Sequence, residues 1–292
     1  MINEYKNKWF RREVPYNEYD ACRFAPDKVA FAKDWIKRQR NGENLLEADN
    51  VVGLICREKV NLITAPYSEL EPKMKWSDKV GVYDLLHEKG FDAIQVPYVF
   101  KGYCKQIDMS IFDYMTEEGA TYIIKTNHGS GWNIRYTVGK GNKENIIKNV
   151  NAWLNQNYAY ISGCEYQYKW IKPGIVIQKL LTDVPLDWSF WCIDGEIEGI
   201  GLTKKFGKNY EEYVAFSDKD GNMPKWFIGA EPEMMFLNKK QKEIIEKMKP
   251  YVYEIAKGFK FVRVDMYYAN GQIYFGEATF TPCSGILDVS FT

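Results

Sequence analysis

The sequence predicts an α+β fold, in which antiparallel pairs of strands alternate with helices. The first hundred or so residues carry mainly helical patterns, whereas β-branched and aromatic runs dominate from Thr121 onward. The dipeptides Asp194-Gly195 and Asn270-Gly271 each separate two such runs, and both are common in tight hairpin turns. Hairpins with helices between them build antiparallel sheets, so a parallel doubly wound sheet is not expected.

Two helices are expected near the N-terminus. One begins at Asp27, directly after Pro26, and runs toward the stop signal Asn41-Gly42, because proline favours helix starts and glycine favours helix ends. The other begins near Ser77-Asp78, whose short polar side chains suit an N-cap, and it ends at Gly90. Residues 1–115 are therefore expected to form a mainly helical N-terminal region.

The middle of the chain is expected to contain strands around a glycine loop. Residues 122–125 form a short β-branched run, which the loop at 128–131 interrupts. A helix is expected from Asn142, because apolar side chains then recur at helical spacing. Residues 175–178 are expected to form another strand. A first α+β lobe is therefore expected over residues 116–175.

The C-terminal part is expected to contain two hairpins and a helix between them. The hairpins pair residues 187–193 with 196–202, and residues 260–268 with 272–276. The helix begins at Asn238 and ends at Gly258. Pro250 is expected to kink or divide it, because proline lacks the N–H that continues the helix. Residues 176–292 are therefore expected to form a second α+β lobe.

Composition and charge exclude several classes of protein. The chain has 292 residues, of which 46% are hydrophobic, and its formal net charge is zero. Broad electrostatic attraction to nucleic acid or to an anionic membrane is therefore not expected. No stretch approaches the roughly 20 apolar residues of a membrane span. The N-terminus lacks the apolar core of a signal peptide, so a cytoplasmic protein is expected.

Cysteine and histidine usage restricts the kind of metal site. Two histidines exclude a histidine-rich site, so any metal is expected to bind carboxylates, which points to a hard cation such as Mg²⁺. The cysteines contain no C-x-x-C pair, so they are expected to be reduced packing residues rather than a disulfide framework or a zinc site. They are Cys22, Cys56, Cys104, Cys164, Cys192 and Cys283.

The strongest candidate site lies on the second C-terminal hairpin. Arg263 and Asp265 are two residues apart on one strand, so both side chains leave the same face. The returning strand places Glu277 beside Asp265 if its face matches. Two carboxylates and an arginine on one surface suit Mg²⁺ bound to triphosphate oxygens, with Arg263 on the γ-phosphate. A solvated polar face with a surface ion pair is the alternative.

A second candidate is the loop that follows Lys125. A lysine at a strand end before a small flexible loop can place its ammonium and backbone N–H groups around phosphates. The loop has neither the Walker spacing nor the G-x-G-x-x-G spacing, so an ordinary hairpin loop is the alternative. His128 can act as a general base or simply form hydrogen bonds, and Lys79 can be a solvated lysine at a helix start. Residues 178–181 can be a buried strand end.

The order of these motifs is more specific than any one of them. ATP-grasp enzymes carry the same motifs in the same order. The order is a lysine, a second lysine before a glycine loop, an apolar strand with a polar end, and finally R-x-D…E-x-T. The chain resembles the TupA-like ATP-grasp family, which is linked to teichuronopeptide and other surface-polysaccharide genes. The resemblance covers roughly residues 75–285. Its segments are 77–79, 124–131, 166–169, 171–173, 187–188, 194–195, 261–267, 273–277, 279–282 and 284–285.

The resemblance implies an ATP-grasp fold and a role for each matching residue. In this fold two α+β lobes, preceded here by the mainly helical region, clasp ATP. Lys79 and Lys125 resemble the lysines that contact the phosphates. The flap over the phosphates is implied to be His128, Gly129, Ser130 and Gly131. The adenosine-binding positions are implied to be Gln178, Lys179, Leu180 and Asp187.

The same resemblance implies where magnesium and the reacting phosphate bind. Asp265, Glu277 and Thr279 stand at the Mg²⁺-binding positions, and Arg263 stands at the γ-phosphate. Arg263, Lys125 and His128 are therefore the expected catalytic residues.

Besides Gln178, which stands where ATP-grasp proteins usually have a glutamate near the adenine amino group, three positions depart from the family pattern. Thr279 replaces the asparagine of E-x-N. Ser189 stands where relatives often carry lysine, and Tyr83 replaces a frequent arginine four residues after the first lysine. These differences bear on the substrate more than on the use of ATP.

The activity implied is that of a ligase that uses ATP and Mg²⁺ to join a carboxylate to an amine through an acyl phosphate. The acid is expected to be a uronic acid or acidic sugar of a capsule or cell-surface polysaccharide, and the amine an amino acid or small amine. Lys204, Lys205 and Lys208 can bind such an acid or be solvated loop residues.

Two other functions remain open. A glycosyltransferase needs a nucleotide-sugar site, but the D-x-D at residues 218–220 leads into Gly221-Asn222, which indicates a turn. A catalytically silent nucleotide-binding domain is the other alternative, and Thr279 and Ser189 favour it.

Overall fold

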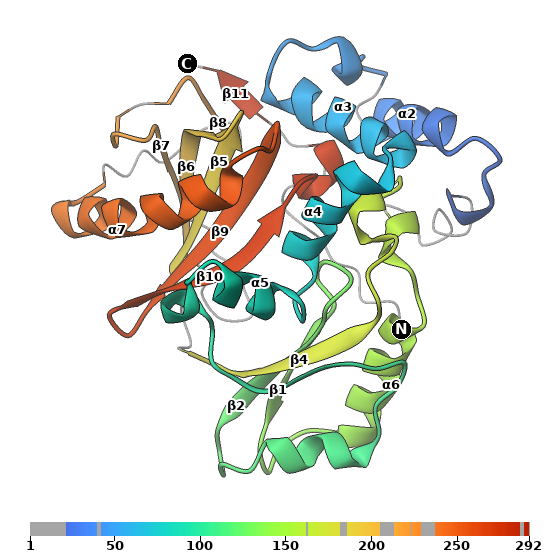
Figure 1. The fold of residues 1–292 in the computed structure, drawn as a ribbon, viewed down its shortest axis with the longest axis vertical. Helices are drawn as coiled ribbons and strands as arrows, with labels where there is room; N and C mark the ends of the chain where they lie inside the picture. Colours follow the sequence, from blue (N-terminus) through green and yellow to red (C-terminus); the bar gives the residue numbers. More distant parts are fainter. Residues whose placement is uncertain are drawn as a thin grey trace. The chain divides into compact units, whose positions relative to one another are not determined.

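The computed structural model describes residues 22–39, 42–161, 163–181, 186–204, 213–222, 224–228, 237–286 and 289–291. Contacts along the chain divide it into two compact units. One unit comprises Met1–Pro66, Tyr160–Tyr166 and Val184–Thr292, and we call it the outer unit because it includes both ends of the sequence. The other comprises Tyr67–Ala159 and Gln167–Asp183, and we call it the central unit because it comes from the middle of the sequence. Figure 1 shows both units and labels many of their helices and strands.

The central unit is built on a four-stranded antiparallel sheet with the order β1-β4-β2-β3. Its strands are β1 (Tyr98–Tyr103), β2 (Thr121–Thr126), β3 (Asn133–Thr137) and β4 (Gly174–Lys179). Its helices include α4 (Tyr67–Ser77), α5 (Val82–Glu88), α6 (Lys143–Leu154), η2 (Asp92–Ile94) and η3 (Met109–Tyr114). Ile146 and Val150 of α6 lie in one core cluster with Ile124 and Ile177 of the sheet, which fixes the glycine loop between β2 and β3 on a packed base.

The outer unit is built on a five-stranded antiparallel sheet with the order β10-β9-β5-β6-β7. These strands are β5 (Leu186–Ile193), β6 (Glu196–Lys204), β7 (Tyr213–Ser217), β9 (Phe261–Ala269) and β10 (Gln272–Thr279). A smaller pair consists of β8 (Trp226–Ile228) and β11 (Val289–Phe291).

Helices pack on the outer unit's sheet. They include α2 (Lys28–Gln39), α3 (Val51–Thr64), α7 (Lys239–Ala256), η1 (Leu45–Glu47) and η6 (Pro282–Gly285). Two further short 3₁₀ helices are η4 (Tyr158–Tyr160) and η5 (Tyr166–Tyr168). Trp35 of α2 and Ile55 of α3 share a core cluster with Trp191 and Phe261 of the sheet. The helix α7 packs against β9, β5 and β6, as Figure 1 shows.

The predicted α+β class is confirmed, and both hairpins form where their turn residues predict. Asp194 and Asn270 have φ values of 52° and 52°, and each precedes a glycine with positive φ, as tight hairpin turns of type I′ require. Asn142 caps α6 through a hydrogen bond from the Asn145 N–H at 2.8 Å. Asn238 caps α7 in the same way. The helix α7 is not divided at Pro250 but continues to Ala256.

The predicted helix start at Ser77-Asp78 is wrong. Ser77 is the last residue of α4, and α5 begins only at Val82. The Asp78 carboxylate does accept from the Val80 N–H at 2.9 Å, as an N-cap side chain does, but it also accepts from Asn127 and Tyr103, which lie far away in the sequence. The expected local hydrogen bond therefore forms together with two tertiary ones, and the regular helix begins only at Val82.

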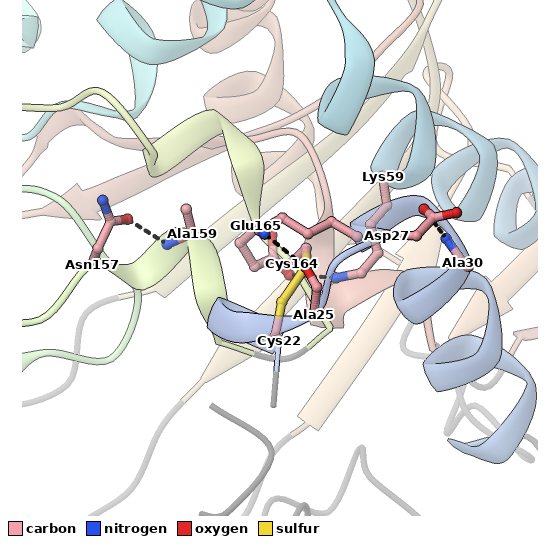
Figure 2. The surroundings of a disulfide bond; sticks show 10 residues. Cys22, Ala25, Asp27, Ala30, Lys59, Asn157, Ala159, Cys164 and Glu165 are labelled. Carbon is pink, nitrogen blue, oxygen red and sulfur yellow. Dashed lines mark hydrogen bonds and ion pairs between the residues drawn. A yellow bond between two sulfur atoms is a disulfide. The ribbon is translucent and has the colours of Figure 1, made fainter. Parts of the chain in front are cut away.

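The prediction that all cysteines are reduced is wrong for one pair. Cys22 and Cys164 form a disulfide, with Cα atoms 6.6 Å apart and a separation of 142 positions in the sequence (Figure 2). No local spacing pattern reveals a pair so distant in the chain. In the part of the chain that the structure describes, no helix has the length and apolar character needed to cross a bilayer.

Candidate active site

Arg263 and Asp265 of β9 meet on one face of the outer unit's sheet. The guanidinium binds the carboxylate through two nitrogens, with Nε–Oδ1 at 2.8 Å and Nη2–Oδ2 at 2.6 Å. The side chains are only 18% and 11% exposed. A bidentate pair of this kind fixes the orientation of both groups, so β9 presents a rigid guanidinium and carboxylate.

A bulge in β10 places Glu277 on the same face. Phe275 lies opposite Met266, but Glu277 lies opposite Asp265, because Gly276 is an extra residue in β10. Without this bulge, Glu277 would lie opposite Val264 and its side chain would leave the other face. A Cβ atom on Gly276 would lie 2.8 Å from the Asp265 carbonyl oxygen, so the bulge needs glycine.

The expected position of Glu277, beside Asp265 on the neighbouring strand, is therefore confirmed. Glu277 Oε1 lies 3.6 Å from Arg263 Nη2 and 3.4 Å from the Thr279 hydroxyl. That hydroxyl also accepts a 3.4 Å hydrogen bond from Arg263. We call Arg263, Asp265, Glu277 and Thr279 the acidic wall.

The neighbouring strand β5 completes this face. Asp187, Ser189 and Trp191 lie opposite Tyr267, Asp265 and Arg263, respectively. Ser189 forms a hydrogen bond with Asp265. The Arg263 guanidinium lies 5.6 Å from the centre of the Trp191 ring, within the range of a cation–π contact. The expected ribose residue Asp187 therefore lies on the same face as the acidic wall.

Burial and close charges set the protonation of the wall. Burial lowers the pKa of Arg263, but the Asp265 carboxylate outweighs this effect and raises the pKa above the ordinary arginine value. Burial and the nearby Glu277 raise the pKa of Asp265, against the opposing effect of Arg263. Burial, followed by the charges of Asp187 and Glu277, raises the pKa of Tyr267 well above 10. The wall is therefore a place where an added cation relieves repulsion between carboxylates.

The donor set fits magnesium bound jointly with phosphate. Asp265 and Glu277 supply hard carboxylate oxygens on one face, as Mg²⁺ prefers. Among the described residues, no group of three or more His, Cys, Asp or Glu side chains is placed to hold a metal alone. Mg²⁺ usually binds through one or two carboxylates plus substrate phosphates, and the wall matches this pattern.

In the central unit, Lys79 and the glycine loop are directly linked. The Lys79 ammonium donates to the Gly129 carbonyl at 2.7 Å, and the Lys79 N–H donates to the Asn127 carbonyl at 3.3 Å. The buried Asp78 carboxylate accepts from Asn127 Nδ2 at 2.7 Å and from the Tyr103 hydroxyl at 2.7 Å. This network ties the segment after α4 to the loop, so the structure brings these two predicted phosphate-binding segments together.

His128 is part of the loop's anchor. Its side chain is buried, with Nδ1 3.1 Å from Asn127 Oδ1 and Nε2 3.1 Å from the Gln156 carbonyl oxygen. Burial lowers the pKa of His128 below 6.5, and the nearby Lys79 ammonium lowers it further. Both ring nitrogens contact protein oxygens. Of the two roles considered for His128, general base and hydrogen-bonding residue, the structure shows the hydrogen bonds.

The two loop glycines serve different purposes. Gly131 has a φ of 71° and open space around its Cα, so its conformation requires glycine. Gly129 is buried, and a Cβ atom there would lie 2.7 Å from both the Trp132 and the Tyr158 ring. Ser130 and Gly131 are exposed, whereas Gly129 is packed. The exposed tip of the loop is therefore shorter than the expected flap.

The remaining predicted residues lie on neighbouring strands of the same sheet. Lys125 of β2 is half-buried and lies opposite Val176 of β4. Lys179 forms an exposed ion pair with Glu117, with the charged atoms 2.6 Å apart. The Leu180 N–H donates to the Thr121 carbonyl at 2.9 Å, so this N–H is committed to the sheet rather than to a bound base.

Some predicted residues lie outside the described part of the chain, and some site residues were missed. Lys205 and Lys208 are outside the described residues. Asp78 was expected only as a helix cap and Asn127 only as part of the segment 124–131, although their shared hydrogen bond organises the loop. Trp191 was missed as well, although its position two residues after Ser189 on one strand places both on the same face.

The sequence was compared with models of known protein families. The family described as TupA-like ATPgrasp matches residues 59–291. The chain belongs to this family. A search of curated proteins finds no match.

Several solved structures are similar to part of this TupA-like protein. D-alanine–D-alanine ligase from Bacillus anthracis is 16% identical, with a TM-score of 0.41 over 70% of this chain and 57% of that protein. The enzyme of the same name from Helicobacter pylori is 13% identical, with a TM-score of 0.44 over 72% and 56%. The ATP-grasp ligase PsnB with minimal precursor, Mg and ADP is 14% identical, with a TM-score of 0.40 over 88% and 66%. The chain spans less than two thirds of the length of each.

Two of the departures of this TupA-like protein from the family pattern, Tyr83 and Gln178, contact one another in the structure. Gln178 donates to the Tyr83 hydroxyl at 2.6 Å, and Tyr83 donates to the Val96 carbonyl at 3.0 Å. Burial raises the pKa of Tyr83 to about 12, so it remains a neutral phenol. Ser189 and Thr279 likewise contact Asp265 and Arg263. The unusual residues therefore form their own hydrogen bonds with the predicted site residues or with each other.

Proposed function

We propose that this TupA-like ATP-grasp protein is a ligase that uses ATP and Mg²⁺ to join a carboxylate to an amine. The observation that carries the proposal is the acidic wall, in which the bulge at Gly276 turns Glu277 onto the face of Arg263 and Asp265. A wall of two carboxylates and one guanidinium suits a metal-bound triphosphate better than it suits an uncharged ligand.

The reaction proposed has two steps. A carboxylate oxygen of the acid attacks the γ-phosphorus of ATP, ADP leaves, and an acyl phosphate forms. The amine then attacks the acyl carbon, phosphate leaves, and the amine gives up a proton, which leaves an amide. Arg263 neutralises charge on the transferred phosphoryl oxygens, and no nucleophilic side chain is needed.

The other predicted roles belong to the same proposal. Asp265 and Glu277 hold Mg²⁺, which supplies charge neutralisation at the phosphates, and Thr279 contributes at most its hydroxyl. Lys79 and Lys125 contact phosphates. The loop closes over the phosphates through its exposed tip, Ser130 and Gly131, with Gly129 and His128 as its packed base.

The adenosine-binding roles and the lobes are also proposed. Gln178, Lys179, Leu180 and Asp187 bind adenosine, with Leu180 acting through a group other than its N–H. The two ATP-grasp lobes are proposed over residues 116–175 and 176–292, after a mainly helical region over 1–115. The strand β4, which spans the boundary between the lobes, belongs to the sheet of the first lobe.

The substrates proposed are a uronic acid or acidic sugar and an amino acid or small amine. The product belongs to a capsule or cell-surface polysaccharide, and the protein acts in the cytoplasm. The support for this class is membership of the TupA-like family. The absence of net charge supports small-molecule partners rather than nucleic acid.

A glycosyltransferase has less support. Asp218 accepts hydrogen bonds from the N–H groups of Asp220 and Asn222 at 2.9 and 2.7 Å. These bonds make the D-x-D segment a closed turn whose first carboxylate binds its own backbone.

To test the proposal, the protein is incubated with ATP, Mg²⁺ and a panel of uronic acids and amines, and the release of ADP is measured. ADP release that requires both an acid and an amine supports a ligase, and mass spectrometry identifies the amide. Transfer of a sugar without ADP release would support a glycosyltransferase. Nucleotide binding with no product from any pair would support a catalytically silent domain.

A further inference from the structure

A buried ion pair lies in the outer unit, apart from the acidic wall. Lys59 of α3 is fully buried, with Nζ 3.3 Å from Glu165 Oε1 and 5.0 Å from the centre of the Trp35 ring. Burial lowers the pKa of Lys59, and the Glu165 carboxylate opposes this effect. Burying two charges is costly, and well-packed apolar residues often stabilise a fold as much. Stability alone therefore does not explain why both charges are buried here.

Both oxygens of the Glu165 carboxylate bind the loop after β10. Thr281 donates its hydroxyl to Oε2, and Ser284 donates its hydroxyl to Oε1, the oxygen that also faces Lys59. All of these side chains are buried. Glu165 therefore fastens the loop at two points, three residues apart.

The fastened loop has an unusual backbone. Cys283 and Ser284 have left-handed φ values of 48° and 56°, and Gly285 follows with 80°. Residues other than glycine rarely adopt this conformation, so the surroundings of Cys283 and Ser284 must hold it. Glu165 holds the loop through Thr281 and Ser284, and Cys56 of α3 holds it at a further point, because its Sγ donates to the Gly285 carbonyl at 2.9 Å.

The loop borders the acidic wall. Thr279 lies opposite Arg263 in the β9–β10 ladder, and Thr281 follows two residues later. Cys283 packs against the core cluster that contains Trp191, and the Trp191 ring centre lies 5.6 Å from the Arg263 guanidinium. The backbone path from Thr281 to Gly285 therefore helps to determine what surrounds the Arg263 guanidinium.

We propose that Lys59 and Glu165 are positioning residues for the reaction: through the hydroxyls of Thr281 and Ser284, their ion pair fixes the left-handed loop that borders Arg263. The proposal rests on the ligase function proposed above and adds residues to it that the family motifs do not include. The disulfide at Cys164, directly before Glu165, further restrains the backbone that carries this carboxylate (Figure 2).

The test compares Thr281→Val with Thr281→Ser. Valine keeps the shape of threonine but lacks the hydroxyl, whereas serine keeps the hydroxyl and loses a methyl group. We expect Thr281→Val to speed amide hydrogen exchange over residues 283–286 by roughly tenfold or more, because it removes a hydrogen bond to a charged group. We expect kcat for ADP release to fall ~10–100-fold, with the Kd for a non-hydrolysable ATP analogue almost unchanged. Thr281→Ser should restore both exchange and kcat.

A second variant addresses the ion pair itself. Glu165→Gln alone leaves Lys59 buried without its counter-charge, so the double variant Lys59→Met with Glu165→Gln is the better choice. It should reproduce the loss of kcat seen for Thr281→Val while the protein remains folded by circular dichroism.

Equal exchange and equal kcat in the valine and serine variants would overturn the proposal. A lower melting temperature in Thr281→Val with unchanged exchange and kcat would also overturn it, because the hydroxyl would then serve stability alone. If the wild-type protein releases no ADP with any acid and amine, the ligase function fails. The exchange measurement would then still decide whether the cluster holds the loop.

Discussion

Glu277 is the wall residue whose charge can be removed with the least damage to the fold. Its side chain is 31% exposed, whereas Asp265 is 11% exposed and binds Arg263 bidentately. We expect Glu277→Gln to lower kcat ~10²–10³-fold with little change in melting temperature. Asp265→Asn should lower both. Thr279→Ala should cost less than either, because its contacts are long, at 3.4 Å.

Steady-state ADP release at saturating Mg²⁺, together with thermal melting, checks this prediction. Glu243→Gln, an exposed position on α7, is the matched control and should behave as wild type. Near-normal turnover of Glu277→Gln and Asp265→Asn would remove the metal role from the wall.

His128 should make the stability of the protein depend on pH. Burial lowers its pKa below the ordinary 6.5, so the unfolded chain binds the proton more readily than the folded chain. This residue's contribution to stability is complete above pH 6.5 and is lost as the pH falls through its lower folded pKa. The change amounts to at most about 1.4 kcal/mol per pH unit for one proton.

Melting curves between pH 5 and pH 8, without ligands, measure this effect. We expect His128→Gln to flatten the acid side of the curve. Identical slopes in wild type and His128→Gln would show that the buried ring does not titrate as proposed.

Single residues were predictable where the pattern was local. The pairing of Arg263 with Asp265 follows from a separation of two residues on one strand. The role of Asp78 was not predictable, because its partners Asn127 and Tyr103 come from other segments. The hydrogen bond between Tyr83 and Gln178 was hidden for the same reason, although both had been singled out as departures.

At the scale of elements, the hairpins were predictable and the bulge was not. Asp194-Gly195 and Asn270-Gly271 encode their turns in two adjacent residues with positive φ. Gly276 lies within a strand, and one glycine there does not reveal whether the strand gains an extra residue. The face of Glu277 therefore had to come from the structure.

The loop between β2 and β3 should respond to nucleotide at its tip. Ser130 and Gly131 are exposed, whereas His128 and Gly129 are packed. We expect a non-hydrolysable ATP analogue with Mg²⁺ to slow amide exchange at residues 130–133 more than at 126–129. Equal exchange with and without the analogue would mean that the loop is a structural hairpin.

Glycine variants separate packing from backbone freedom in this loop. Gly131→Ala should cost about 1 kcal/mol of stability, because its φ of 71° is left-handed. Gly129→Ala should cost about 1–3 kcal/mol, because its Cβ would collide with the Trp132 and Tyr158 rings. Chemical denaturation of both variants measures the difference, and a larger loss for Gly131→Ala would contradict this account.

At the scale of the whole molecule, sequence order revealed the family better than any local feature did. The motifs come from both compact units, and the outer unit itself is assembled from three separate stretches of chain. Local patterns do not predict such an assembly, and they did not predict the disulfide between Cys22 and Cys164 or the ion pair between Lys59 and Glu165. Each of these contacts joins residues more than a hundred positions apart.

The fate of the carboxylate oxygen tests the central claim most directly. An acid that supports turnover is labelled with ¹⁸O in its carboxylate, and the phosphate and nucleotide products are analysed by mass spectrometry. Attack of the carboxylate on the γ-phosphorus predicts ADP together with phosphate that carries one ¹⁸O atom from the acid. Label in AMP, with release of pyrophosphate, would contradict an acyl phosphate and with it the proposed use of the acidic wall.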